Sequence, residues 1–328
     1  MEFRTKVELP IGLWQIRHSD KLMLWGSCFV EHVGKLLENN KFTCLMNPYG
    51  ILYNPMSIGK AMTEILDGKS YGRDDLHYNG RIWYSLMHHG SFSALDPDDC
   101  LERINGSLEK ARKQMDETDW LILTFGTSRV YEWKEDGQIV GNCHKLPDSM
   151  FRRRLLEVDE IVDFYTVLLQ RLFNKNPRLN VLFTVSPIRH AKDGMHGNQL
   201  NKAVLLLAVD KLCNKFANCF YFPSYEIMMD ELRDYRFYAD DMLHPSEMAV
   251  KYIWKCFCSV SFDKKSLDFM KEWDSIRKGL EHIPFNPQSE NYHTFIRQIL
   301  LKIECLKEKF PYLDAQNEIA ICQVRLKK

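Results

Sequence analysis

Two groups of residues in this sequence have the types and spacing that covalent catalysis by a serine requires. Ser27 follows Gly26 directly after the apolar run Leu22–Trp25, and Asp241 and His244 lie three residues apart much later in the chain. A serine hydroxyl is a poor nucleophile until a neighbouring base removes its proton. An imidazole oriented by a carboxylate is a suitable base. The working hypothesis is therefore that Ser27 is a nucleophile served by this Asp–His pair.

Structural roles compete with this chemistry at each position. Ser27 precedes a helical pattern, and serine is a good N-terminal helix cap. An Asp-x-x-His spacing also occurs on many solvated helix faces. Cys28 could itself be the nucleophile because a helix N-terminus acidifies a thiol, or it could be small core packing. The residues alone leave these alternatives open.

The elements that would position these residues alternate along the chain. Short apolar runs predict buried strands, each followed by a helical pattern, and this alternation predicts a mainly parallel sheet covered by helices on both faces, a three-layer α/β/α fold. The predicted strands end near residues 26, 46, 125, 185 and 222. Ser27 would then lie at the carboxyl end of the first strand, where ligands bind in such folds. A hairpin is predicted from residues 130–133 and 138–140.

The chain divides at about residue 260 on the same grounds. Residues 1–260 carry the alternating pattern and are predicted to be the catalytic domain. Residues 261–328 turn helical and more charged, with two amphipathic helices. This segment is predicted to be a helical extension that packs on the core or on a partner, which leaves open an oligomer formed through the C-terminal helices.

Composition excludes several functional classes. The 328 residues are 45% hydrophobic, and Lys+Arg and Asp+Glu number 44 each, so no basic surplus suggests nucleic acid. No apolar run approaches the length of a membrane span, and the N-terminal residues lack the features of a signal peptide. The ten cysteines show no disulfide framework. We expect a cytoplasmic protein that binds neither nucleic acid nor membrane.

Several motifs together resemble one family. The sequence has Gly26-Ser27-Cys28-Phe29, and further motifs at 47–55, 126–131, 142–145, 186–190 and 231–245. These are similar to the GSCFA-domain family of bacterial proteins, with Val30 in place of the final Ala of the motif. That family is placed near the SGNH (GDSL-type) hydrolases. The resemblance implies a flavodoxin-like SGNH fold, with Ser27 as nucleophile, His244 as general base and Asp241 orienting His244.

The donors of an oxyanion hole are less clear from the resemblance. SGNH enzymes use an Asn side chain from a Gly-x-Asn-Asp block, but Thr127-Ser128 follows Gly126 here. Gly50 could provide a backbone donor, and the side-chain donor could be Asn47, Ser128 or Asn142.

Four further residues are candidates for substrate binding. His88 and His89 are predicted to line the cleft, because no metal-ligand spacing surrounds them. Arg189 and His190 follow a predicted strand and could face an acidic or sugar group of the substrate, or form a structural ion pair.

The sequence therefore predicts a serine-dependent ester hydrolase, of the acylesterase or deacetylase kind, acting on an acylated carbohydrate or small metabolite. It predicts no cofactor and no metal. An O-acyltransferase is the close variant, since only the acceptor of the acyl group differs. The alternative from another class is a non-catalytic protein that retains the cleft to bind a glycan or a partner.

Overall fold

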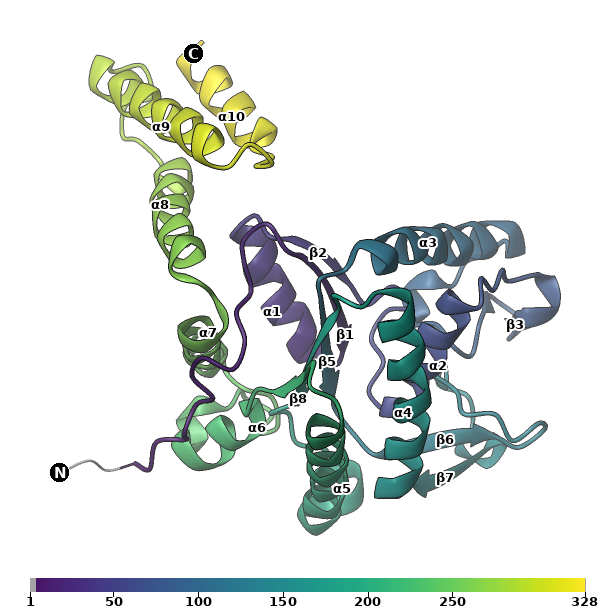
Figure 1. The fold of residues 1–328 in the computed structure, drawn as a ribbon. Helices are drawn as coiled ribbons and strands as arrows, with labels where there is room; N and C mark the ends of the chain where they lie inside the picture. Colours follow the sequence, from purple (N-terminus) through teal and green to yellow (C-terminus); the bar gives the residue numbers. More distant parts are fainter. Residues whose placement is uncertain (1–3, 328) are drawn as a thin grey trace.

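The fold is organised around a central parallel sheet (Figure 1). The computed structural model describes residues 4–327. Five strands, all paired in parallel, lie in the order β2-β1-β5-β8-β9. Their bounds are β1 (Lys21–Gly26), β2 (Thr43–Met46), β5 (Trp120–Phe125), β8 (Asn180–Val185) and β9 (Cys219–Tyr221). Numbered along the chain, this order is 2-1-3-4-5, that of flavodoxin-like folds, and it confirms the predicted fold class.

Alternate residues of β1 show the three layers directly. Leu22 and Leu24 pack in a core on one face of the sheet, whereas Met23 and Trp25 pack in the core on the other face. The first face is covered by α1 (Cys28–Asn39) and α7 (Glu247–Ser261), and the second by α2 (Pro55–Leu66), α3 (Pro97–Glu117), α4 (Val158–Lys175) and α5 (Gly194–Lys215). Strands buried on both faces explain why the sequence shows continuous apolar runs rather than alternation.

Local signals set where several helices begin. Asn54 caps α2 by accepting a hydrogen bond from the Ser57 N–H, and Asp96 caps α3 in the same way. Pro55 and Pro97 follow these caps, where the missing N–H is not needed.

The hairpin predicted from residues 130–133 and 138–140 is present as one antiparallel bridge, Glu132 to Ile139, flanked by the hydrogen bonds from the Trp133 N–H to the Gln138 carbonyl (2.8 Å) and from the Val140 N–H to the Tyr131 carbonyl (2.9 Å). The longer pairing of this segment was not predicted: β6 (Arg129–Trp133) pairs in antiparallel register with β7 (Phe151–Leu155). The β6–β7 pair is favoured because the rings of Trp133 and Phe151 pack 5.2 Å apart and Arg154 pairs with Glu132.

The remaining elements are β3 (His77–Tyr78), β4 (Trp83–Tyr84), η1 (Arg73–Asp75), η2 (Gly90–Phe92), η3 (Asp148–Met150), η4 (Ala191–Asp193), α6 (Ser224–Glu226), η5 (Ile227–Glu231) and η6 (Tyr235–Phe237).

The C-terminal segment forms three helices where the sequence predicted two. They are α8 (Lys264–Glu281), α9 (Glu290–Lys309) and α10 (Gln316–Leu326), and they enclose a core of their own. Of the residues of α10 only Cys322 is buried, which is why its pattern gave no clear amphipathic signal.

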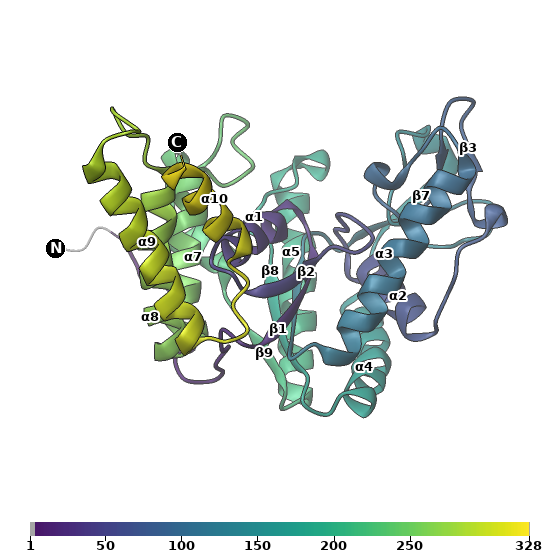
Figure 2. The same cartoon turned by 90° about the horizontal axis from the view of Figure 1, so that it is seen from above.

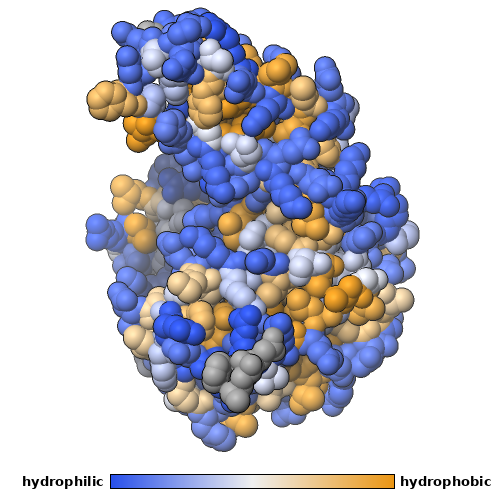
Figure 3. Space-filling view, turned by 90° about the vertical axis from the view of Figure 1, so that its left-hand side faces the viewer, coloured by the Kyte–Doolittle hydropathy of each residue, from blue (hydrophilic) through white to orange (hydrophobic). Residues whose placement is uncertain are grey.

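Figures 1 and 2 show these helices extending from the α7 side of the sheet. They contact the α/β region through the Trp273 Nε1–H, which donates to the Asn39 carbonyl at 3.0 Å, and through the Lys41–Glu318 ion pair at 2.8 Å. The face in Figure 3 is mostly hydrophilic with small apolar patches. No helix within residues 4–327 is long and apolar enough to cross a membrane.

Candidate active site

Ser27 occupies a tight turn between β1 and α1. Gly26 has a φ of +147°, and a Cβ at this position would lie 2.3 Å from the Thr124 carbonyl oxygen, so only glycine fits. Ser27 is extended, caps α1 and is 1% exposed. Its Oγ donates to the Ser186 Oγ at 3.1 Å. The sheet and helix therefore place the Ser27 hydroxyl at the carboxyl ends of β1 and β8.

His244 and Asp241 lie on the irregular loop before α7 and form a compact pair. The Asp241 Oδ1 accepts the N–H groups of His244 and Leu243, each at 2.9 Å, and its Oδ2 lies 2.5 Å from the His244 Nδ1. These backbone donors, His244 first, hold the pKa of Asp241 down at about 2. Asp241 is therefore a carboxylate at neutral pH, and its contact with Nδ1 leaves the His244 Nε2 available.

Arg189 ties this loop to the end of β8. Its backbone N–H donates to the Leu243 carbonyl at 3.2 Å, and its guanidinium donates to the Met242 carbonyl. The guanidinium also stacks over the Tyr238 ring, 4.2 Å from the centroid. Met242 has a φ of +58°, which is costly for a non-glycine residue. Arg189 therefore stabilises a strained backbone that carries His244.

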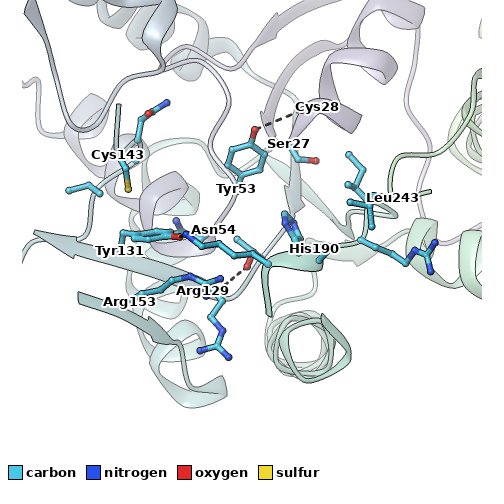
Figure 4. A pocket seen from close by; sticks show the side chains of 18 of the residues that line it. Ser27, Cys28, Tyr53, Asn54, Arg129, Tyr131, Cys143, Arg153, His190 and Leu243 are labelled. Atoms are coloured by element: carbon cyan, nitrogen blue, oxygen red, sulfur yellow. Dashed lines mark hydrogen bonds between the residues drawn. The ribbon is translucent and has the colours of Figure 1, made fainter. Parts of the chain in front are cut away.

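Ser27 and His244 line one cavity of about 620 Å³. Figure 4 shows Ser27 and Cys28 with Tyr53 at one side, His190 below them, and Arg129, Tyr131 and Arg153 at the opposite side. Between Ser27 and His244 themselves the structure shows no hydrogen bond, because the serine donates to Ser186 instead. Ser27 and His244 thus line the same cavity without a hydrogen bond between them.

The other predicted site residues divide into two groups. Asn142, Arg189 and His190 line this cavity. Burial, and then the nearby Lys202, lowers the pKa of His190 to about 4, so its ring is neutral at pH 7. The residues not brought to the cavity are Asn47, Gly50, His88, His89 and Ser128.

The structure corrects the expected roles of Gly50 and Ser128. The Gly50 N–H donates to the Asn47 carbonyl at 2.7 Å within its own turn, so it is not free for an oxyanion. The Ser128 N–H and hydroxyl are both bonded to Asn201, and Ser128 is fully buried. Asn47 supports the site from beneath, because its Oδ1 accepts the Gly26 N–H at 2.9 Å.

His88 and His89 likewise have local structural contacts. The His88 ring stacks on Tyr49 with centroids 4.1 Å apart and is fully buried, and burial lowers its pKa to about 3. His89 accepts the Ser91 N–H at 3.3 Å, in a cap of η2. Neither reaches the cavity. Within residues 4–327, no cluster of three or more His, Cys, Asp or Glu could hold a metal.

Thr127 is a site residue that sequence reasoning did not assign. It lines the cavity directly after β5, and its Oγ1 accepts hydrogen bonds from the Arg129 N–H at 3.0 Å and the Asn201 Nδ2 at 2.9 Å. A hydroxyl has two acceptor positions and one proton. With both acceptor positions used, the Thr127 proton is free to donate. The sequence feature that could have pointed to Thr127 is its position directly after a central strand.

Lys202 is a second unassigned residue and lies beneath the site. It is 0% exposed, and its Nζ donates to the Gly126 carbonyl at 2.8 Å and the Ser186 carbonyl at 2.7 Å. Desolvation lowers its pKa to about 7. Lys202 therefore joins the carboxyl ends of β5 and β8 under Ser27. Its position in an otherwise ordinary helix gave no sequence signal.

The fold and site define a doubly wound α/β protein with a serine and an Asp–His pair at the strand ends. The family model described as the GSCFA family matches residues 21–257, and the model described as the GSCFA domain protein, C-terminal domain, matches residues 273–328. The chain belongs to the GSCFA family, as its motifs suggested.

Two solved structures are similar at low identity. One is described as a candidate platelet activating factor from Streptococcus pneumonia (10% identity, TM-score 0.37, covering 74% of this chain and 83% of that one). The other is a Clostridium thermocellum family 3 carbohydrate esterase (11% identity, TM-score 0.34, covering 77% and 98%). The comparison with curated proteins found no match.

Proposed function

We propose that this protein is a serine-dependent ester hydrolase that removes an acyl group from an acylated carbohydrate or small metabolite. The observation that supports this most directly is the shared cavity, in which Ser27 and the Asp241-oriented His244 are both present. A binding protein has no need of a charged Asp–His pair beside a serine that lies at a helix N-terminus.

The reaction proceeds through an acyl-enzyme. Ser27 turns from Ser186 towards the His244 Nε2, which takes its proton as the Ser27 Oγ attacks the ester carbonyl. The tetrahedral intermediate collapses, the alcohol leaves with the proton from His244, and the acyl group stays on Ser27. His244 then removes a proton from water as that water attacks the acyl carbonyl, and His244 returns the proton to the Ser27 Oγ as the acid is released. Catalytic hydrogen bonds that are loose in a free enzyme tighten in the substrate complex.

Donors for the oxyanion come from the elements around Ser27. The Ser27 N–H lies at a helix start, where N–H groups favour anions. The Thr127 hydroxyl supplies the side-chain donor in place of the expected Asn, and Asn142 is the alternative. Losing one such donor typically costs about 2.7–4 kcal/mol of transition-state stabilisation, so Thr127→Val should lower kcat strongly with little change in KM.

A fluorophosphonate probe tests the proposal. An activated serine should be labelled at Ser27, and labelling should disappear in Ser27→Ala and fall sharply in His244→Gln. The same variants should lose hydrolysis of an activated acetyl ester. An unlabelled wild-type protein that also fails to hydrolyse such esters would contradict the proposal.

The second candidate is a non-catalytic protein that binds a glycan or partner in the same cavity. The hydrogen bond from Ser27 to Ser186, rather than to His244, favours it. Glycan binding that is equal in wild type and Ser27→Ala, without any labelling, would establish it. An O-acyltransferase would be labelled at Ser27 and would transfer the acyl group to an added sugar alcohol faster than to water.

A further inference from the structure

The cavity wall opposite Ser27 is rich in cationic side chains. Five of them line the cavity, against one carboxylate, Asp148; the five are Arg129, Lys145, Arg153, Arg189 and Lys192. The chain as a whole has equal numbers of acidic and basic residues. The excess is therefore a local property of this cavity and not a consequence of a basic protein.

Three of these cations already have partners. The Arg153 guanidinium makes two hydrogen bonds to the Asp193 carboxylate, the second at 2.6 Å. Lys192 donates to the Tyr131 hydroxyl at 2.8 Å and lies 3.4 Å from Asp148. Arg189 supports the loop that carries His244. Each of these charges has at least one hydrogen-bond partner within the protein, so they do not by themselves require a ligand.

Arg129 is different, because its guanidinium has an ion pair but no hydrogen bond to another residue within residues 4–327. Its nearest carboxylate is Asp193, 3.6 Å from the Nε, and no side-chain hydrogen bond joins them within the described residues. Arg153 holds Asp193 in two hydrogen bonds and keeps the pKa of that carboxyl below its usual range. Asp193 is thus committed to Arg153, and the Arg129 side chain, about a quarter exposed, has donors to spare.

Lys145 is unpartnered and is held by a costly backbone. It makes no ion pair or hydrogen bond with any residue in 4–327, and it follows His144 in a pair of left-handed residues (φ +49° and +59°). The His144 N–H donates to the Asn142 Oδ1 at 2.8 Å, and its Nε2 lies 2.8 Å from the Ser85 carbonyl oxygen. These contacts fix the turn that carries Lys145 at the cavity.

We propose that the substrate carries a negatively charged group, a carboxylate above all, which binds to Arg129 and Lys145 while its ester lies at Ser27. The planar guanidinium matches the two oxygens of a carboxylate, and charge-assisted pairs of this kind are strong. This inference rests on the proposed hydrolase and specifies its substrate class, an acylated acidic sugar or another acylated organic acid.

A matched pair of esters tests the inference. Methyl O-acetyl-glucuronate and methyl O-acetyl-glucoside differ only at C6, which is a carboxylate in the first and a hydroxymethyl group in the second. For the wild-type protein we expect kcat/KM to be at least about tenfold higher for the acidic ester, and the preference to weaken with added salt because charge pairs near the surface are screened. Arg129→Gln should reduce this preference at least about fivefold, and Lys145→Gln should reduce it less. The exposed Arg73→Gln, outside the cavity, is the matched control and should preserve it.

A binding measurement separates this inference from the hydrolase proposal. Calorimetry with Ser27→Ala should detect methyl glucuronate binding, weaker binding of methyl glucoside, and loss of the difference in Ser27→Ala/Arg129→Gln. Hydrolysis of both esters at equal rates would overturn the inference and leave the hydrolase intact. Binding of the acid through Arg129 without hydrolysis of any ester would contradict the hydrolase proposal and leave the anion-binding site intact. Thermal unfolding of each variant identifies a folding defect, and Lys145→Gln, on an exposed side chain, repeats the test if Arg129→Gln unfolds.

Discussion

The two sides of the candidate active site are held in opposite ways. Ser27 is buried at the junction of a central strand and a helix, and its position follows from the sheet. The His244 side chain is 46% exposed on an irregular loop, and its position depends on Asp241 within the loop and Arg189 outside it. Ser27 is therefore fixed by the core, whereas His244 is fixed by a few polar contacts.

This difference explains why the two groups share a cavity without a hydrogen bond between them. Core positions tolerate little displacement because interiors are close-packed. A loop held by a few hydrogen bonds can shift at lower cost. We infer that the final approach of Ser27 and His244 involves rotation of the serine side chain and adjustment of the loop, with little change in the sheet.

The largest expected effect distinguishes the role of Ser27 from that of its hydrogen-bond partner, Ser186. Ser27→Ala should reduce ester hydrolysis by about 10³-fold or more, because the nucleophile is lost. Ser186→Ala removes only the group that accepts the Ser27 proton in the free protein, and should retain activity within about tenfold. Steady-state kinetics on one activated ester compares them. Equal loss in both variants would mean that Ser186 is part of the catalytic machinery.

The second prediction tests how strictly the core fixes the serine turn. Gly26→Ala should destabilise the fold by about 2–5 kcal/mol, because it adds both a disfavoured φ and a clash with the Thr124 carbonyl. Gly68→Ala is the matched control, since Gly68 has a φ of +71° with no atom near its missing Cβ. It should cost only about 1–2 kcal/mol. Urea unfolding measures both, and equal values would show that the clash is relieved by movement of β1 or β5.

The third prediction tests the loop side. Arg189→Met keeps the stem but removes the hydrogen bond to the Met242 carbonyl and the charge over Tyr238. We expect kcat/KM to fall about 10- to 100-fold, since a small displacement of a catalytic group is costly, with little change in unfolding free energy.

Arg233→Met is the control for this loop variant. Arg233 makes an exposed ion pair with Asp230 just before the loop, and exposed pairs contribute little, so activity should stay within about twofold. If Arg189→Met behaves like the control, the loop does not depend on Arg189.

Much of this architecture could be predicted from local sequence. The run ending at Gly26-Ser27 and the Asp241–His244 spacing are local signals, and Ser27 and His244 line one cavity. The hydrogen-bond donors proposed for the oxyanion could not be predicted so well. Thr127 gains its free proton only because Asn201, 74 residues away, fills an acceptor position, whereas Gly50 is used within its own turn. Hydrogen-bond saturation depends on tertiary contacts that one sequence does not reveal.

The smallest effect concerns the pH dependence of stability. It should come from Lys202, which lies beneath Ser27 at the ends of the strands. Lys202 has a pKa of about 7 in the folded protein and 10.5 as its ordinary value. Between these values the unfolded chain binds more protons, so stability rises with pH, by at most about 1.4 kcal/mol per unit, and this gain is lost as pH falls towards 7. Asp241, with a pKa of about 2, contributes no such change above about pH 5.

Urea unfolding of the wild-type protein and Lys202→Met at pH 6, 7.5 and 9 measures this contribution. The difference between them should move in favour of the wild type from pH 7.5 to 9 and change less from pH 6 to 7.5, because Lys202 in the folded protein begins to lose its proton only near pH 7. A difference that is constant up to pH 9 would mean that the two carbonyls keep Lys202 charged. Lys202 would then be a permanent cation beneath Ser27, and the strand side would be held by a fixed charge rather than by a neutral amine.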